Sequence, residues 1–370
     1  MMSRETSQER HASTGMWSAA WTALVALSLS SILTWAPGTA GASSVAETDD
    51  DALVASIDID RMMGTVDALQ DFGSREFHLE SSRQAAEFLY EAFEEIGIPV
   101  EYQYFMVEDT RVSNVVATLH GSDGEADMYL FGAHYDSENM WVSNISTAEN
   151  LTAPGADDDA SGVAAVLEMA RVLKSSGFPA TVKFVMFGAE EYGYDNTGGR
   201  RGSQHFAAQE ASLGHVYSGT ATLDMIGYRD GNDNKAVLVV NDDGYALADS
   251  TSRAVDRFGT DLDLEVLVDP TITYSDHSSF WDEGMPSMLV VEELDDLFFP
   301  VNPSYHTSYD TVDILSPEQL EAVTEALLGG LLLVDDGDDY TLLIFGTAIM
   351  SAAIVSVVLF IHIRRGRGRS

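Results

Sequence analysis

The sequence predicts an α/β fold of three layers, in which a mixed, mostly parallel sheet lies between helices on both of its faces. Two observations lead to this fold class. From about residue 57 to residue 334, strand-like and helix-like segments alternate along the chain. Several strand-like segments are apolar at nearly every position, which is typical of strands covered on both faces. A chain of 370 residues has room for one such domain, at residues 57–334, and for further segments at its ends.

The individual elements follow from the spacing of their apolar residues and from the residues that end them. Residues 81–97 repeat apolar side chains at helical spacing, and Gly97 ends this helix. Two more helices are expected at residues 160–176 and at residues 316–334, the latter with Pro317 in its first turn. Strands are expected at residues 100–107, 112–119, 127–134, 180–191, 220–227, 235–240 and 286–293.

The chain is strongly acidic, with 60 acidic and 19 basic residues and a formal net charge of −41. Its lysines are Lys174, Lys183 and Lys235. At molar salt the Debye length falls to about 3 Å, so that the repulsion between these charges is screened. Because 45% of the residues are hydrophobic, the chain is not a disordered acidic tail. We interpret it as a folded protein adapted to high salt, and its charge argues against nucleic acid as a partner.

A transmembrane helix is expected near the C-terminal end, at residues 340–363. The run from Tyr340 to Ile361 contains no charged residue and is long enough to cross a hydrocarbon core of about 30 Å. Acidic residues at 335–339 precede it as a juxtamembrane linker, and the tail at residues 364–370 contains four arginines. By the positive-inside rule the tail is cytoplasmic, and the domain before the span lies outside the cell membrane.

Residues 1–42 have the features of a signal peptide or of an uncleaved N-terminal anchor. Arg4 and Arg10 precede an apolar stretch, and the residues at 40–42 match an A-x-A cleavage pattern. Either form places the middle of the chain outside the cell. Residues 43–56 are expected to form a short acidic linker between this segment and the domain.

Residues of metal-binding types follow three of the predicted strands at the point where each strand ends. His134 follows one apolar strand, Glu190 and Glu191 follow the next, and Asp224 follows a third. Ligands of open α/β sheets bind beyond the carboxyl ends of the strands, so we expect these side chains at one edge of the sheet. The chain has no cysteine, so a metal here would be held by histidine and carboxylate ligands.

Further residues of the same types lie in predicted loops. Asp158 is the middle residue of a run of three aspartates, and the last of them, Asp159, can cap the helix that begins near residue 160. His277 and His306 lie beside carboxylates in the segments YSDHSSF and SYHTSYDT. With His134, they are the three histidines whose loop positions beside carboxylates suit a metal ligand.

Five segments in this order, GAHYDS, APGADDDASG, FGAEEYG, LDMIG and YHTSYDT, resemble the M28 family of zinc aminopeptidases. The resemblance runs from about Gly73 to the last predicted helix near Leu328. It implies a zinc-exopeptidase-like fold and a site that holds two zinc ions per chain. The metal ligands that it implies are His134, Asp158, Glu191, Asp224 and His306, with Asp158 as the bridge between the two ions.

The resemblance also implies how such a site works. Two zinc ions would lower the pKa of a shared water, and Glu190 is expected to act as the general base. Asp136 is expected to fix the ring of His134. Asp276 and His277 are expected near the site in supporting roles.

Two features near the expected site have less defined roles. Tyr305 is a candidate donor to the tetrahedral oxyanion, and a packed aromatic residue is the alternative. The loop at residues 135–157 contains Trp141 and two sequons, at Asn144 and Asn150, which are potential glycosylation sites. We expect this loop to border the mouth of the pocket.

The sequence therefore predicts a membrane-anchored exopeptidase that removes N-terminal residues from peptides outside the cell. A glutaminyl cyclase is an alternative, because HYDS and LDMIG also suit that related single-zinc acyltransferase, although GADDDASG favours the dizinc peptidase. A surface binding protein that has lost activity is a third alternative. Against it, all five ligand positions and the base position hold competent residues.

The acidity of the exterior part generates a first prediction. Apart from six terminal arginines, Glu5 and Glu9, the chain holds 13 basic and 58 acidic residues, a charge of −45. We expect its melting temperature to rise steeply from dilute buffer to molar salt, because the carboxylates repel one another unless salt screens them. Scanning fluorimetry across a salt series measures this rise. A melting temperature that does not change with salt would contradict adaptation to high salt.

Overall fold

The computed structural model describes residues 49–122, 127–139, 152–191, 199–241, 243–295 and 300–335, all within one unit of the chain. The predicted N-terminal segment at residues 1–42, the membrane span at 340–363 and the basic tail at 364–370 lie outside the described residues. Trp141, Asn144 and Asn150 lie outside them too. Within the described ranges, no helix combines the length and the apolar character that a membrane span requires.

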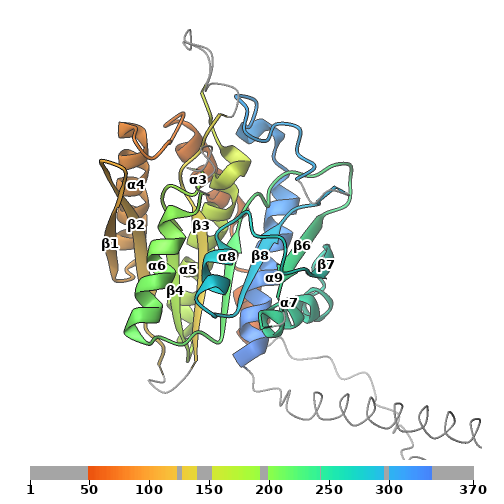
Figure 1. Ribbon diagram of the computed structural model, residues 1–370. Coiled ribbons are helices and arrows are strands. Elements are labelled where there is room, and N and C mark those ends of the chain that lie inside the picture. Colours follow the sequence, from red (N-terminus) through yellow and green to blue (C-terminus); the bar gives the residue numbers. More distant parts are fainter. Residues whose placement is uncertain are drawn as a thin grey trace, which may run out of the picture. The chain divides into compact units, whose positions relative to one another are not determined.

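An eight-stranded sheet carries the fold (Figure 1). Its strands are β1 (Val100–Val107), β2 (Thr110–Leu119), β3 (Met128–His134), β4 (Thr181–Phe187), β5 (Gly219–Leu223), β6 (Lys235–Val240), β7 (Asp263–Val268) and β8 (Ser287–Val291). Across the sheet they lie in the order β1-β2-β4-β3-β5-β8-β6-β7. Four of the seven pairings are parallel, including all those among β4, β3, β5 and β8. The predicted mixed, mostly parallel sheet is therefore confirmed.

Helices cover both faces of the sheet and complete the three predicted layers. One layer contains α2 (Asp49–Val54), α3 (Ile59–Gln70), α4 (Glu80–Ile96), α5 (Gly162–Ser176), α7 (Tyr245–Phe258) and α9 (Pro317–Asp335). Apolar side chains of this layer share one core with the strands. The opposite face carries α6 (Arg201–Leu213) and α8 (His277–Asp282), which lie in front of the sheet in Figure 1. There Phe206 and Phe280 pack against Phe187 of β4.

Helix α2 lies within the segment that was expected to be an acidic linker, residues 43–56. Val54 of this helix is 5% exposed and belongs to the main core. Arg257 on α7 donates a hydrogen bond to Asp51 at 2.8 Å. The linker prediction is therefore wrong for residues 49–54, because the acidic composition of the segment hid the apolar and paired side chains that fix it to the domain.

The parallel strands bring their carboxyl ends together at one edge of the sheet. His134 ends β3 and lies opposite Phe187, the last residue of β4. The next parallel strand, β5, ends at Leu223 and pairs there with Ala133 of β3. The segments that follow β3, β4 and β5 therefore start side by side, as the positions of the candidate ligands predicted.

Arg75, in the loop between α3 and α4, is fully buried beside this edge. Its guanidinium donates hydrogen bonds to four main-chain carbonyl oxygens, those of Leu69 at 3.2 Å, Tyr135 at 2.7 Å, Pro154 at 2.5 Å and Gly155 at 2.9 Å. Burial lowers the pKa of Arg75, and several nearby carboxylates act in the opposite direction. These bonds hold the chain after β3 against the segment that leads into α5.

We expect Arg75→Leu to lower the free energy of unfolding by about 3–5 kcal/mol, because it leaves buried carbonyl oxygens without donors and removes a buried cation from among carboxylates. Urea denaturation followed by circular dichroism measures the loss. Arg83→Leu on α4 is the matched control, since this exposed guanidinium pairs with Glu80 and Glu87 at the surface. A loss of equal size in both variants would contradict the role given to Arg75.

Candidate metal centre

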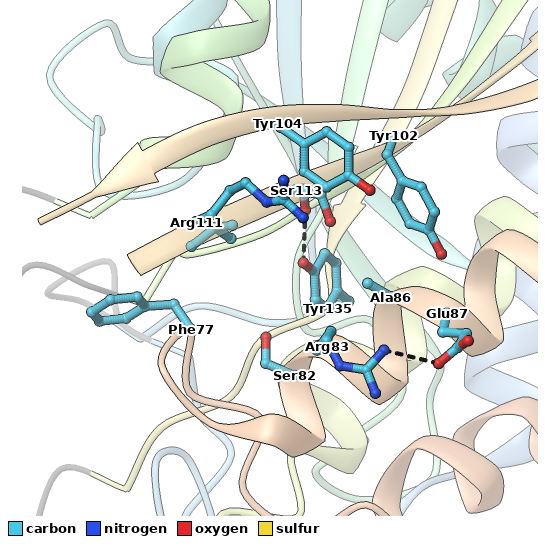
Figure 2. A pocket seen from close by; sticks show the side chains of 11 residues that line it. Phe77, Ser82, Arg83, Ala86, Glu87, Tyr102, Tyr104, Arg111, Ser113 and Tyr135 are labelled. Carbon is cyan, nitrogen blue, oxygen red and sulfur yellow. Dashed lines mark hydrogen bonds and ion pairs between the residues drawn. The ribbon is translucent and has the colours of Figure 1, made fainter. Parts of the chain in front are cut away.

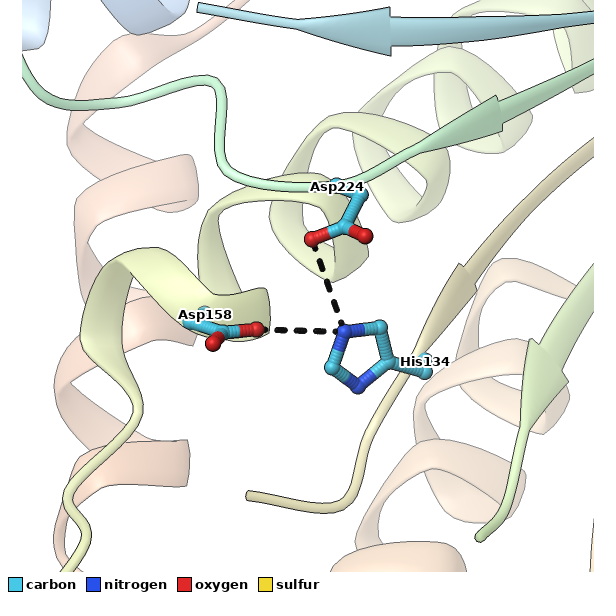
Figure 3. Close-up of side chains that lie close together, drawn as sticks. All are labelled: His134, Asp158 and Asp224. Atoms are coloured by element: carbon cyan, nitrogen blue, oxygen red, sulfur yellow. Dashed lines mark ion pairs between the residues drawn. The ribbon is translucent and has the colours of Figure 1, made fainter. Parts of the chain in front are cut away.

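Two buried groups of predicted ligands lie at the carboxyl edge of the sheet. In the first group, His134 Nε2 lies 3.2 Å from Asp158 Oδ1 and 3.6 Å from Asp224 Oδ1 (Figure 3). His134 ends β3, Asp224 follows β5, and Asp158 lies in the turn that leads into α5. Three separate elements therefore direct possible ligand atoms to one place.

The second group shares Asp158 with the first. His306 Nε2 lies 3.1 Å from Asp158 Oδ2 and 2.8 Å from Glu191 Oε2. One oxygen of Asp158 therefore faces His134, and the other faces His306. A carboxylate placed between two imidazoles, each beside a further carboxylate, suits a bridged pair of metal ions.

The buried atoms of these side chains fit metal ions. His134 Nε2, Asp158 Oδ2 and Glu191 Oε1 are buried and accept or donate no hydrogen bond within the described residues. Buried polar atoms of folded proteins nearly always have a partner, so these atoms indicate a ligand. The donors are imidazole nitrogens and carboxylate oxygens, a set that is typical of zinc sites without thiolates.

Asp136 holds the main chain that carries the two glutamates. Its carboxylate accepts hydrogen bonds from the N–H groups of Glu190 at 3.0 Å and Glu191 at 3.1 Å. Its Oδ1 also lies 3.6 Å from His134 Nδ1, which is longer than a hydrogen bond. Asp136 thus faces the ring of His134, as the sequence suggested, and in addition ties the end of β3 to the segment after β4.

Asp159 connects the same elements from the other side. It accepts hydrogen bonds from the N–H groups of His134 at 3.2 Å, Met225 at 3.2 Å and Gly162 at 3.0 Å. The bond to Gly162 is the helix cap that the sequence allowed. The other two bonds join the ends of β3 and β5, a role that the sequence did not indicate.

Two buried aspartates that sequence reasoning missed fix the main chain of Asp158. Asp310 accepts hydrogen bonds from the N–H groups of Asp157 at 2.8 Å and Asp158 at 3.1 Å. Asp157 in turn accepts from Asn302 Nδ2 at 2.7 Å and from the N–H of Gly227 at 2.8 Å. The sequence feature that could have indicated Asp310 is its position in YHTSYDT, four residues after the predicted ligand His306.

Three residues at the site adopt the left-handed backbone conformation that side chains disfavour. The φ angle is 59° at Ala189, directly before Glu190, 59° at Met225, directly after Asp224, and 54° at His306 itself. Such conformations cost free energy and persist where surrounding contacts impose them, often at functional sites. Here they turn the chain sharply beside each of these side chains.

Burial and neighbouring charges shift the titration of the site. Burial raises the pKa of Asp158, but the imidazoles of His134 and His306 together outweigh it, so its pKa lies below the usual value. Burial raises the pKa of Glu191 to about 8. Burial also raises the pKa of Glu190 well above its usual value, against the opposing effect of His134. Crowded carboxyl groups of this kind favour a cation in their midst.

A cavity of about 90 Å³ lies over the ligands and contains the predicted general base. Glu190 lines this cavity and is 8% exposed. Tyr305 also lines it, and its ring stacks on His306 with the centroids 3.8 Å apart. Tyr305 is thus packed against a ligand and also faces the cavity, so both roles considered for it fit this position. The apolar part of the wall consists of Met225, Tyr274, Val291, Pro300 and Tyr305.

His277 and Asp276 lie near the site without joining either ligand group. His277 is buried, its Nε2 is hydrogen-bonded to the carbonyl oxygen of Ile272 at 2.9 Å, and burial lowers its pKa to about 4. This histidine is therefore neutral and packs against Trp281. Burial raises the pKa of Asp276 to about 7.

Glu138 is a residue near the second group that sequence reasoning missed. Its Oε1 lies 3.9 Å from His306 Nδ1, and it falls within reach of a metal together with Glu191 and His306. The sequence feature that could have indicated Glu138 is its spacing. Glu138 lies two residues after Asp136, and Asp136 lies two residues after His134. Glu138 faces the ring of His306 much as Asp136 faces that of His134.

Comparisons with known proteins agree with this geometry. Residues 114–330 match the model of Peptidase family M28. The chain is 27% identical over 272 residues to the Escherichia coli protein YfbL, covering 68% of this chain and 80% of that one. It is 30% identical over 287 residues to leucine aminopeptidase 1 of Coccidioides posadasii, covering 73% of this chain and 69% of the relative.

Solved structures of several enzymes share the fold. The LapA aminopeptidase of Legionella pneumophila superposes with a TM-score of 0.64 at 23% identity, over 82% of this chain and 79% of that one. The zinc aminopeptidase of Bacillus subtilis superposes with a TM-score of 0.64 at 16% identity, over 76% of this chain and 96% of that one. A glutaminyl cyclase of Bacteroides thetaiotaomicron superposes with a TM-score of 0.60 at 21% identity, over 74% of this chain and 97% of that one.

The family match covers more than half of the chain and includes the segments that carry all five predicted ligands. The same segments meet at one edge of the sheet in two groups that share Asp158. The chain therefore belongs to peptidase family M28 and is a peptide hydrolase.

Proposed function

We propose that this protein is a dizinc aminopeptidase that removes N-terminal residues from peptides. The observation that carries the proposal is the position of Asp158, whose two oxygens face two histidines, each of which also faces a second carboxylate. The relatives named leucine aminopeptidase support exopeptidase activity. The zinc aminopeptidase that shares the fold supports the choice of metal.

Five residues would hold the two zinc ions: His134 and Asp224 at one ion, His306 and Glu191 at the other, and Asp158 at both. Bound zinc would supply a Lewis acid that polarises the scissile carbonyl and lowers the pKa of a water molecule. The buried carboxylates beside the ligands would not need to move, because main-chain N–H groups already hold them.

Glu190 carries out the proton transfers in this proposal. The Glu190 main chain is fixed on both sides, because its N–H donates to Asp136 at 3.0 Å and its carbonyl oxygen accepts from the N–H of Arg200 at 2.7 Å. The carboxylate accepts a proton from the attacking water and then donates it to the nitrogen of the leaving amine. Its position in the wall of the cavity allows contact with both atoms.

The cavity suits one N-terminal residue with an apolar side chain. Its apolar wall includes Met225, Tyr274 and Val291, and its volume of about 90 Å³ is small. The carboxylates that also line the cavity attract the ammonium group of a free N-terminus. A peptide would therefore enter with its amine towards the metal centre and its first side chain against the apolar wall.

A glutaminyl cyclase is the second candidate, since an enzyme of that name shares the fold. The paired arrangement around Asp158 favours two metal ions and hence the aminopeptidase. The close approach of His134, Asp158 and Asp224, together with Glu190 in the wall of the cavity beside them, supports an active enzyme over an inactive binding protein.

We also propose that the peptidase domain acts outside the cell at high salt concentration and that residues 340–363 anchor it in the membrane. The uncharged run, its arginine tail and the acidic exterior support this location.

We expect the purified protein to contain about two zinc ions per chain and to lose its activity when a chelator removes them. Metal analysis and hydrolysis of leucyl-p-nitroanilide test this, and restored activity after zinc addition is the control. One zinc ion per chain together with cyclase activity would favour the second candidate. Full peptidase activity in metal-free protein would contradict a metal-dependent reaction.

Two variants separate proton transfer from metal binding. We expect Glu190→Gln to lower kcat by roughly 10²–10⁴-fold with little change in KM or zinc content, because an amide cannot accept the proton. Glu191→Gln should instead lower the zinc content, because an amide is a poorer ligand than a carboxylate. Zinc analysis and steady-state kinetics of both variants measure these effects. If Glu190→Gln loses zinc and Glu191→Gln keeps it, the two roles are reversed.

A further inference from the structure

Three cavities lie in a row along the edge of the sheet, starting at the metal centre. The cavity over the ligands shares Glu191 with a second cavity of about 320 Å³, which is bordered by Asp136, Glu138 and Thr110. The second cavity shares Phe77 with a third one of about 280 Å³, between α4 and the hairpin of β1 and β2 (Figure 2). The three cavities therefore border one another and define a path from the candidate active site to this hairpin.

The third cavity contains arginine and tyrosine side chains. The guanidinium carbon of Arg111 lies 4.4 Å from the centroid of the Tyr104 ring (Figure 2). The ring of Tyr102 lies beside it, with its centroid 5.6 Å from that of Tyr104. The hydroxyl of Tyr135, on the floor of the cavity, is bound to the carbonyl oxygen of Ser113 at 2.7 Å. Arg111 is thus placed by stacking and not by an ion pair.

The charge of Arg111 is not balanced by a neighbouring carboxylate. Arg83, in the same cavity, pairs with Glu80 at 2.5 Å and with Glu87 at 3.1 Å. Arg111 forms no ion pair with any carboxylate in the ranges that the structure describes, although the chain contains 60 acidic residues. A guanidinium that is oriented by an aromatic ring and has no acidic partner can bind a carboxylate of a ligand through two parallel hydrogen bonds.

The amino end of α4 adds to this preference for an anion. Ser82 and Arg83, in its first turn, line the cavity. The preceding residue, Leu79, provides no side-chain cap for the helix. The start of a 17-residue helix favours a negative charge nearby, and Glu80 in this first turn pairs with Arg83.

The sheet places Arg111 a few residues' length from the scissile bond. Strand β2 runs antiparallel to β4, so its first residues lie at the edge where β4 ends and Glu190 and Glu191 begin. Strand β4 separates β2 from β3, and the register places Arg111 three residues beyond the position opposite His134. Two strand spacings across the sheet and three residues along it separate Arg111 from His134 by roughly 14 Å. An extended peptide advances about 3.3 Å per residue and covers this distance with about four residues.

We propose that Arg111 binds a carboxylate group of the substrate, about four residues beyond the bond that is cut. This inference rests on the aminopeptidase function proposed above. The carboxylate is either the C-terminal group of a short peptide or the side chain of an acidic residue at that place. The amine of the peptide would lie at the acidic metal centre, and its carboxylate at the basic end of the path.

The test compares peptides that differ in one carboxylate. Leucyl-tetraalanine is used as the free acid and as the C-terminal amide, and a second pair of amidated pentapeptides ends in glutamate or in glutamine. Leucyl-p-nitroanilide, which has no carboxylate, reports the chemistry alone. Each substrate is measured with the zinc-loaded native protein, with Arg111→Gln and with Arg253→Gln. Arg253 lies on α7, beside the opposite half of the sheet, and controls for the loss of one positive charge.

We expect the native protein to cleave at least one carboxylate substrate about tenfold more efficiently than its neutral partner, mainly through a lower KM. Arg111→Gln should abolish this difference and leave the hydrolysis of leucyl-p-nitroanilide unchanged, and Arg253→Gln should alter neither. The pair that shows the difference identifies the source of the carboxylate. If leucyl-p-nitroanilide is cleaved but neither pair depends on Arg111, the inference is overturned and the proposed function stands. If the native protein cleaves no leucyl substrate, the proposed function fails and the inference with it.

Discussion

The concentration of buried carboxylates at one edge of the sheet is the constraint on which the rest of the structure depends. Asp157, Asp158, Asp159 and Asp310 are all buried there. They fall into two kinds by their partners. Asp157, Asp159 and Asp310 accept hydrogen bonds from main-chain N–H groups, although burial still raises the pKa of each. Asp158 faces imidazoles and keeps a buried oxygen without a hydrogen-bond donor. The three aspartates that bind main-chain N–H groups fix the loops of the site. Asp158 has a buried oxygen that a cation could bind.

The parallel sheet supplies the N–H groups that make this arrangement possible. At the carboxyl ends of β3, β4 and β5 the chain leaves the sheet, so its N–H groups no longer pair with a neighbouring strand and bind aspartates instead. Arg75 adds four donors to carbonyl oxygens on the same side and holds the loops in place. The left-handed residue Met225 donates one of these bonds, to Asp159, and Ala189 directly precedes Glu190, which donates another. The same hydrogen bonds therefore stabilise the ends of the strands and position the side chains of the site.

The sequence predicted the features that are local and missed those that depend on distant contacts. Seven strands, most of which contain apolar runs, and the ligand types at the ends of three of them were visible in single segments. Strand β7 was missed because it is a six-residue edge strand that mixes acidic with apolar residues and buries none of them fully. The bond from Asp157 to Asp310 joins residues 153 positions apart, and no local pattern indicates it. Helix α2 was missed because two apolar residues fix an otherwise acidic segment.

High salt, as the composition predicts, would change how charged groups contribute to specificity. At molar salt the screening length is about 3 Å, so the acidic surface cannot steer a charged peptide from a distance. Discrimination must then come from groups in direct contact with the substrate. The buried carboxylates at the metal centre and Arg111, held by the ring of Tyr104, are groups of this kind, because their positions do not depend on long-range attraction. An acidic surface for solubility and fixed charges in the path for recognition can thus coexist in one domain.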